Sequence, residues 1–204
     1  MTASSGTAYT VRRLTSEEIA GPRLDEALCV FADAIGFPRQ HARVTGLGET
    51  LRRHVLRAGF AAFGAFERGP GGEVSPGLAQ APDTAAPLVG FSYGYTSQPG
   101  LWWREQIVPA LSPEQRDYWL ANAFELAELH VHPSAQGQRL GSALHDRLMD
   151  TARVATHRTA LLSVMHRSER ARRLFTRRGW QTLVPELRFS TDPATPFSIL
   201  GLEL

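Results

Sequence analysis

The sequence predicts a mixed α/β fold in which helices flank one central twisted sheet. Short apolar runs typical of strands alternate along the chain with segments whose apolar residues recur every three or four positions, as on one face of a helix. Near residue 131 the apolar spacing changes from the period of a strand to that of a helix, which indicates a strand, a loop and a helix in succession. The length of 204 residues and an apolar fraction of 43% predict a single domain, 1–204, with insertions.

The expected strands and helices alternate from one end of the chain to the other. Strands are expected at 9–14, 60–66, 88–95, 124–131, 160–165, 180–189 and 197–202. Helices are expected at 16–35 with Ser16 as N-cap, at 49–58, from Pro113 behind the N-cap Ser112, at 140–152 and at 168–178. Two segments interrupt this order. Residues 68–87, rich in Gly, Pro, Ala and Ser, predict a long mobile loop between two strands, and 96–123 predicts an insertion that contains Trp102 and Trp103.

The composition argues against several classes of protein. No apolar run approaches 18 residues, and the first ten residues lack a charged segment followed by an apolar one, so we expect a soluble, cytoplasmic protein without a membrane partner. Cys29 is the single cysteine, which rules out an internal disulfide. His130 and His132 have the spacing of metal ligands on a strand, but no third ligand can be identified, and no metal site is expected.

All 22 basic residues are arginine, and they are unevenly distributed. The segment 136–178 contains ten arginines and three acidic residues, an excess that predicts contact with a polyanion. The alternatives are a nucleic acid and a phosphorylated small molecule. The arginines of 170–178 would spread over several faces of the predicted helix instead of forming one stripe, which favours the small molecule.

One segment joins a strand to a helix through a loop that contains two glycines. It reads Leu129-His-Val-His-Pro-Ser-Ala-Gln-Gly-Gln-Arg-Leu-Gly-Ser142. The first amides of a helix have no intrahelical acceptor and carry the positive end of the helix dipole, so they can bind a pyrophosphate. Gly137 and Gly141 permit close approach because they lack a Cβ. On the glycines alone, an ordinary strand-to-helix turn is the simpler interpretation.

This segment resembles the central motif of the GNAT superfamily of acyl-CoA N-acyltransferases. The matching residues are Val131, Pro133, Gln136 and Gly141. Arg139 stands where the family usually has its middle glycine, so we expect the loop to be shaped or solvated slightly differently. Its amide can still point at a phosphate if its φ is negative. A second family block, Asn-x-x-Ala-x-x-Leu-Tyr-x-x-x-Gly-Phe, reads here as Ser168, Ala171, Leu174, Phe175, Gly179 and Trp180.

The resemblance implies that acetyl-CoA is the co-substrate and that no metal takes part. In the family, the strand before the motif diverges from its neighbour, and the pantetheine arm pairs with the exposed backbone. The amides that follow would hold the pyrophosphate, aided by the Arg139 side chain. The residues expected to bind the coenzyme are Leu129, Val131, Gln136, Gly137, Gln138, Arg139, Leu140, Gly141, Ser142, Ser168 and Phe175.

Acyl transfer also needs a base, because only the neutral form of an amine attacks the thioester. By resemblance, Glu125 is the first candidate. Glu128 is the second, and it lies on the opposite face if the strand is regular. The tyrosine that usually protonates the leaving thiolate is replaced by Phe175. A hydroxyl from elsewhere, such as that of Tyr93 or Tyr95, could substitute for it, or the thiolate could leave unprotonated or take a proton from water.

The sequence therefore predicts an N-acetyltransferase that moves an acetyl group from acetyl-CoA to a primary amine of a small molecule or peptide by direct attack. No nucleic-acid partner is expected, and a homodimer stays open. The alternative is a GNAT-like module that binds acyl-CoA without transferring the acyl group. The changes at Arg139 and Phe175 support this alternative.

Overall fold

The computed structural model describes residues 8–68 and 86–204. Its strands are β1 (Ala8–Leu14), β2 (Ala61–Arg68), β3 (Leu88–Thr96), β4 (Ala123–Val131), β5 (Thr159–Met165), β6 (Gln181–Phe189) and β7 (Asp192–Glu203). Its helices are α1 (Ser16–Ala20), α2 (Leu24–Ile35), α3 (Ala42–His54), α4 (Trp102–Ile107), α5 (Pro113–Trp119), α6 (Leu140–Val154) and α7 (Glu169–Arg177). The predicted mixed α/β fold is confirmed. The mobility predicted for 68–87 concerns a segment that lies almost wholly outside the described residues.

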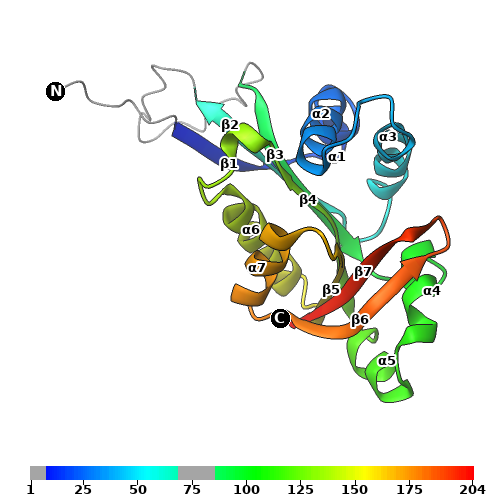
Figure 1. The fold of residues 1–204 in the computed structure, drawn as a ribbon. Coiled ribbons are helices and arrows are strands. Elements are labelled where there is room, and N and C mark those ends of the chain that lie inside the picture. The colour runs from blue at the N-terminus through cyan, green and yellow to red at the C-terminus, as the bar shows by residue number, and fades with distance from the viewer. Residues whose placement is uncertain (1–7, 69–85) are drawn as a thin grey trace.

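One mixed sheet organises the described chain. Its strands lie in the order β1-β2-β3-β4-β5-β7-β6, and β4 and β5 are parallel whereas the other neighbours are antiparallel. Helices α1, α2 and α3 lie on one side of the sheet, and α6 and α7 lie on the other (Figure 1). The sheet therefore separates a side that carries the strand-loop-helix motif from a side that carries the N-terminal helices.

The α6 side contains the largest apolar cluster. Leu144 and Leu148 are fully buried one turn apart, and they pack with Leu126 and Leu162 of the sheet. Burying a leucine side chain stabilises the fold by about 1.5–3 kcal/mol. The apolar residues whose spacing of four predicted this helix therefore form the stripe that packs α6 against the sheet. This packing places the N-terminus of α6 beside the end of β4.

The N-terminal helices differ from the prediction in their ends. The expected helix 16–35 is broken after Ala20, because Pro22 has no amide hydrogen to continue the hydrogen-bond ladder. The N-cap is Thr15 instead of Ser16: its hydroxyl accepts from the Glu18 amide at 3.1 Å, and the Glu18 carboxylate accepts from the Thr15 amide at 2.9 Å. The prediction was thus one residue late.

Helix α3 begins at Ala42, well before the predicted start at 49. The His41 side chain caps it, since its Nδ1 accepts from the Arg43 amide at 3.2 Å. Gly46 and Gly48 lie in the first turns and weaken the helical pattern of the sequence. This earlier start matters, because it places Arg43 on a helix.

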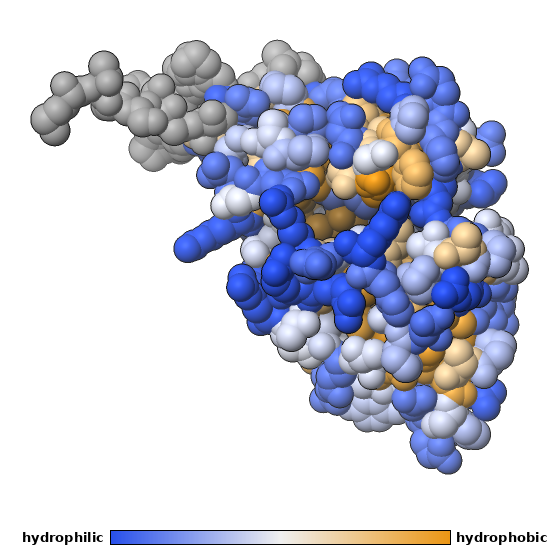
Figure 2. All heavy atoms as spheres, in the orientation of Figure 1, coloured by the Kyte–Doolittle hydropathy of each residue, from blue (hydrophilic) through white to orange (hydrophobic). Residues whose placement is uncertain are grey.

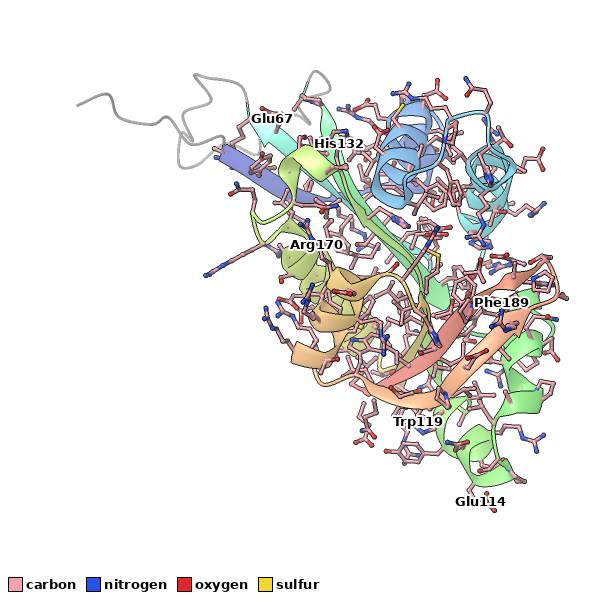
Figure 3. The ribbon with its side chains drawn as sticks, in the orientation of Figure 1. Glu67, Glu114, Trp119, His132, Arg170 and Phe189 are labelled. Carbon is pink, nitrogen blue, oxygen red and sulfur yellow. The ribbon has the colours of Figure 1, made fainter. Side chains whose placement is uncertain are left out.

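The insertion packs on the lower end of the sheet as α4 and α5. The predicted N-cap Ser112 is confirmed, with a hydroxyl that accepts from the Gln115 amide at 3.2 Å. Trp119 and Phe189, both labelled in Figure 3, belong to the apolar cluster that anchors it. Across the described ranges, no helix combines the length and apolarity needed to span a bilayer.

Candidate active site

The parallel strands β4 and β5 diverge after a short contact. They pair at three positions, from Ala123 with Thr159 to Glu125 with Leu161, and β4 then continues to Val131 without a partner on that edge. β5 remains paired with β7 along its whole length, and β4 remains paired with β3, so neither strand can bend back. The predicted opening between these two strands is confirmed.

The free edge of β4 presents backbone groups to this opening. The His132 amide donates to the Val89 carbonyl of β3 at 2.8 Å, and the backbone groups of alternate residues point to opposite edges of a strand. Leu129 and Val131 therefore direct their amide and carbonyl groups away from β3. The Gln136 side chain already donates to the Val131 carbonyl at 3.0 Å, which leaves the Leu129 groups to pair with a ligand.

The loop before α6 contains two residues with positive φ, although only one of them is a glycine. Arg139, the N-cap of α6, has φ 60°, and Gly137 has φ 84°. The negative φ under which the Arg139 amide was expected to reach a phosphate is not present, because the arginine adopts the left-handed conformation that glycine adopts most readily. This costs about 1 kcal/mol relative to glycine and keeps the course of the loop.

The first turn of α6 leaves amides without intrahelical acceptors. Its first helical bond runs from the Ala143 amide to the Arg139 carbonyl at 3.0 Å. The amides of Leu140, Gly141 and Ser142 precede that bond and lie at the positive end of the helix dipole. A Cβ on Gly141 would meet Leu174 at 3.6 Å, so the first turn lies within reach of α7. These groups fit a pyrophosphate.

A residue of α7 contacts the loop between β4 and α6. The Arg170 guanidinium donates to the Gln136 side-chain oxygen, and Arg170 is labelled in Figure 3 on the side of the sheet that carries α6. Gln138 and Arg139 are exposed and free to turn toward a ligand. Ser168 is the N-cap of α7 but makes no side-chain capping bond. Its predicted role in coenzyme binding stays a prediction.

Phe175 is buried in the apolar cluster between α6 and α7. Its side chain is 5% exposed, and its ring centre lies 5.6 Å from that of Trp180 and 6.2 Å from that of His145. The Trp180 indole donates to His145 Nε2 at 2.9 Å. Burial is the main cause that lowers the pKa of His145, so the ring is held neutral. The contact of Phe175 with a coenzyme stays a prediction.

A β-bulge in β4 changes the positions of the candidate bases. Tyr95 pairs with Glu125 and Gly94 with Leu126, but Tyr93 pairs with Glu128, so Ala127 is an extra residue. Tyr93 and Tyr95 are two residues apart and share a face of β3, and their partners share it too. Glu128 therefore lies on the same face as Glu125. The expectation of opposite faces is wrong because the strand is not regular.

Glu125 is a buried carboxylate with one unused oxygen. Its side chain is 3% exposed, the Tyr95 hydroxyl donates to Oε1, and Oε2 has no hydrogen-bond partner among the described residues. Burial raises the pKa of Glu125 to about 7, although the Tyr95 hydrogen bond and the Arg57 charge oppose the rise. A carboxylate with this pKa can accept a proton near neutral pH.

The residues around Glu125 come from a part of the chain that the motifs do not cover. His54, the last residue of α3, lies with Nδ1 3.3 Å from the Tyr93 hydroxyl. Burial, with help from Arg57 and Arg53, lowers the pKa of His54 to about 3, so the ring is neutral. The Arg57 guanidinium carbon lies 4.4 Å from the centre of the Tyr95 ring. No sequence motif marks this group of residues around Glu125; its one sign was the presence of His54 and Arg57 close together.

Glu128 is more accessible than Glu125 and already has a partner. Its Oε2 lies 2.6 Å from His130 Nε2, and its side chain is 25% exposed. His132 instead contacts Asp33 of α2 at 3.2 Å. In the described part of the chain, no group of three or more potential ligands surrounds these histidines.

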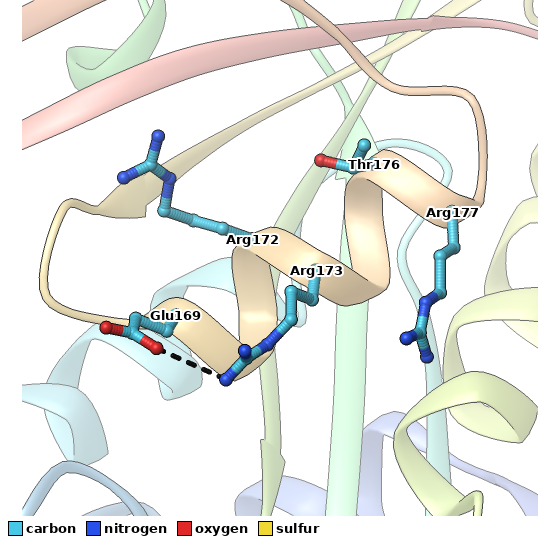
Figure 4. A pocket seen from close by; sticks show the side chains of 5 residues that line it. All are labelled: Glu169, Arg172, Arg173, Thr176 and Arg177. Carbon is cyan, nitrogen blue, oxygen red and sulfur yellow. Dashed lines mark hydrogen bonds and ion pairs between the residues drawn. The ribbon is translucent and has the colours of Figure 1, made fainter.

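Helix α7 carries several of the arginines that the sequence singled out. Glu169 pairs with Arg173 at 3.2 Å, while Arg172 and Arg177 extend from different sides of the helix around a shallow pocket (Figure 4). The side chains do not form a single stripe. The expectation that no nucleic acid binds here stays a prediction.

Comparison with known proteins identifies the family. Residues 110–180 match the family model described as Acetyltransferase (GNAT) family. A GCN5-like protein acetyltransferase of Mycobacterium tuberculosis is 34% identical, with 89% of this chain and 92% of the relative covered. Two solved structures share the fold. The ribosomal-protein-S18-alanine N-acetyltransferase from Escherichia coli has a TM-score of 0.56 at 16% identity, covering 96% of this chain and 94% of that one.

The second is the PaiA N-acetyltransferase from Thermoplasma acidophilum in complex with coenzyme A. It has a TM-score of 0.57 at 14% identity, and the match covers 97% of this chain and 99% of that one. The sequence match and the divergent β4 and β5 point to the same conclusion: the chain belongs to the GNAT family of acetyltransferases.

Proposed function

We propose that the protein transfers an acetyl group from acetyl-CoA to a primary amine carried by a peptide or protein. The observation that carries the proposal is Glu125 Oε2, an unpartnered buried oxygen at the last paired position before β4 and β5 diverge. A similar chain, 34% identical, is named a protein acetyltransferase, which favours a peptide amine over one on a small molecule.

The coenzyme would occupy the α6 side of the opening. The backbone of Leu129 would pair with the pantetheine arm, since its groups point away from β3, and the first amides of α6 would donate to the pyrophosphate. Arg139 adds an exposed guanidinium at the same helix end. The thioester supplies the activated acetyl group.

The amine would approach from the side of the N-terminal helices, because Glu125 and Glu128 share that face of β4. Glu125 Oε2 takes a proton from the ammonium group, directly or through one water molecule. The neutral nitrogen then attacks the thioester carbonyl, a C–N bond forms, and the C–S bond breaks to release the thiolate. The nitrogen loses its second proton to water, which leaves a neutral amide. Glu128 is the second candidate base, on the same face but engaged by His130.

The test combines binding and turnover. Calorimetry with acetyl-CoA should show binding, and a concentration of 100 times Kd should stabilise the fold by about 2.7 kcal/mol. Free-thiol release would then be measured with lysine peptides, simple amines and aminoglycosides, and the product checked by mass spectrometry. Binding without thiol release for any acceptor would support the acyl-CoA-binding module instead. Absence of binding would contradict both.

A further inference from the structure

A cationic cluster lies at the opening on the side of the N-terminal helices. Arg43, in the first turn of α3, crosses to the far side of the opening. Its Nη1 lies 3.8 Å from the sulfur of Met165, the last residue of β5, and its Nη2 lies 3.2 Å from the Thr195 hydroxyl. It also forms an ion pair with Asp192 of β7. The guanidinium of Arg43 therefore lies against the C-terminal end of β5.

A second guanidinium lies close to the first. Arg167 follows β5 by two residues and is exposed. Its guanidinium carbon lies 5.3 Å from the centre of the Phe37 ring, and that of Arg43 lies 5.8 Å from the same centre, so the two carbons are at most about 11 Å apart. Among the described residues, no carboxylate lies within ion-pairing distance of Arg167.

A third donor completes the cluster. The His41 ring stacks on Phe37 with centres 4.2 Å apart. Because its Nδ1 accepts from the Arg43 amide, the neutral ring carries its proton on Nε2, which is then a donor. Glu128 and Asp192 are the acidic groups that act on Arg43, and burial followed by the Arg167 charge lowers the pKa of Arg43. Positive charge is thus only partly compensated here.

We infer that Arg43, Arg167 and His41 form a recognition site for a carboxylate on the acceptor, so that the preferred acceptor is a lysine with a glutamate or aspartate close to it in the peptide. This inference rests on the proposed function. Arginine suits the role because its planar donors match the two oxygens of a carboxylate. Figure 2 shows apolar atoms recessed between hydrophilic side chains on the face that includes α2, α3 and α7, as expected of a groove for a peptide.

Asp192 occupies only part of the proposed carboxylate site, because it pairs with Arg43 and not with Arg167. Asp192 pairs with Arg43 from β7, whereas Arg167 approaches from the turn after β5. A peptide carboxylate would form an ion pair with Arg167, and the positive charge of Arg43 would attract it further. Because Arg167 is exposed, the attraction should be moderate and sensitive to salt.

The experiment uses the full chain and a set of peptides with one lysine. Glutamate is placed at each neighbouring position in turn, and each peptide is matched with its glutamine counterpart. At low salt, we expect kcat/KM for the best glutamate peptide to exceed that of its counterpart about tenfold, with a smaller ratio as salt is added. Arg167→Gln should reduce this ratio to about twofold or less. Arg39→Gln, a change of an exposed arginine on the same α2–α3 connection, is the control and should keep the wild-type ratio.

The outcomes separate this inference from the proposed function. Acetylation of both peptides at equal rates by the wild-type protein would overturn the carboxylate site alone. A preference that survives Arg167→Gln and Arg43→Gln would also overturn it, since it would come from elsewhere. Acetylation of amines but of no peptide would overturn both the peptide acceptor and this site. Arg167→Gln is the main variant, because an exposed side chain with no ion pair among the described residues has little role in folding.

Discussion

Replacing Glu125 by glutamine should have opposite effects on activity and stability. Glutamine keeps the shape of the side chain and can still accept the Tyr95 hydrogen bond, but it cannot take a proton from the amine. If Glu125 is the base, kcat/KM should fall about 10²- to 10⁴-fold. The affinity for acetyl-CoA should change little, because the groups of β4 and α6 that we propose bind the coenzyme are untouched.

The effect on stability follows from the raised pKa. The pKa of Glu125 rises from 4.5 in the unfolded chain to about 7 in the fold, because burial opposes ionisation. Between these values the folded state binds more protons than the unfolded state, so the free energy of unfolding decreases as pH rises. The loss, at about 1.4 kcal/mol per pKa unit, reaches on the order of 3 kcal/mol above pH 7. Glutamine carries no charge and avoids this loss.

Thermal unfolding of both proteins across pH checks the reasoning. The two Tm values should be similar near pH 4.5, and the variant should be more stable above pH 7 by on the order of 5–10 °C for a chain of this length. The wild-type kcat/KM should rise with pH through about 7, and the variant should lose that limb. A Tm difference that does not depend on pH would refute the burial argument. Full activity of Glu125→Gln with loss of activity in Glu128→Gln would move the base to Glu128.

Three further substitutions test neighbouring contacts. Tyr95→Phe removes the hydrogen bond that lowers the pKa of Glu125, so the rising limb of kcat/KM should move to higher pH in a pH profile. Gly94→Ala would place a Cβ against the Glu125 carbonyl, and denaturant unfolding should show a loss of about 1–3 kcal/mol together with reduced turnover. Trp180→Phe leaves His145 Nε2 without its donor and should cost about 1–3 kcal/mol in the same assay, whereas unchanged stability would contradict the buried hydrogen bond.

Much of the fold could be predicted because the core is periodic in the sequence. The stripe of α6, with Leu144 and Leu148 one turn apart, and the continuous apolar run of β5 each specify one kind of element. The loop before α6, which we propose binds the coenzyme, could also be placed from the sequence, because Gln136 and Gly141 keep the spacing of a known motif. These features depend on neighbours in the sequence, so the sequence alone reveals them.

Features that depend on distant contacts could not be predicted. The extra residue Ala127 has no local signal, since a bulge depends on the register with β3, and it decides the face of Glu128. The left-handed conformation of Arg139 is a second case, because residues other than glycine rarely adopt it and the sequence gives no sign of it. His54 and Arg57 are a third, since their role depends on how α3 is placed over Tyr95.

The burial that raises the pKa of Glu125 also bears on the proton of the leaving thiolate. Burial first, and then the neighbouring carboxylates, raise the pKa of Tyr93 well above 10, so a proton transfer from its hydroxyl to a thiolate, with a conjugate-acid pKa of about 8.5, is unfavourable. Glu125, once protonated, has a pKa of about 7 and can pass its proton to the thiolate downhill. One carboxyl group could thus serve both steps, which makes the absence of a hydroxyl at Phe175 tolerable. If so, Tyr93→Phe should change kcat less than tenfold, and a larger loss measured under saturating acetyl-CoA would restore the tyrosine as the acid.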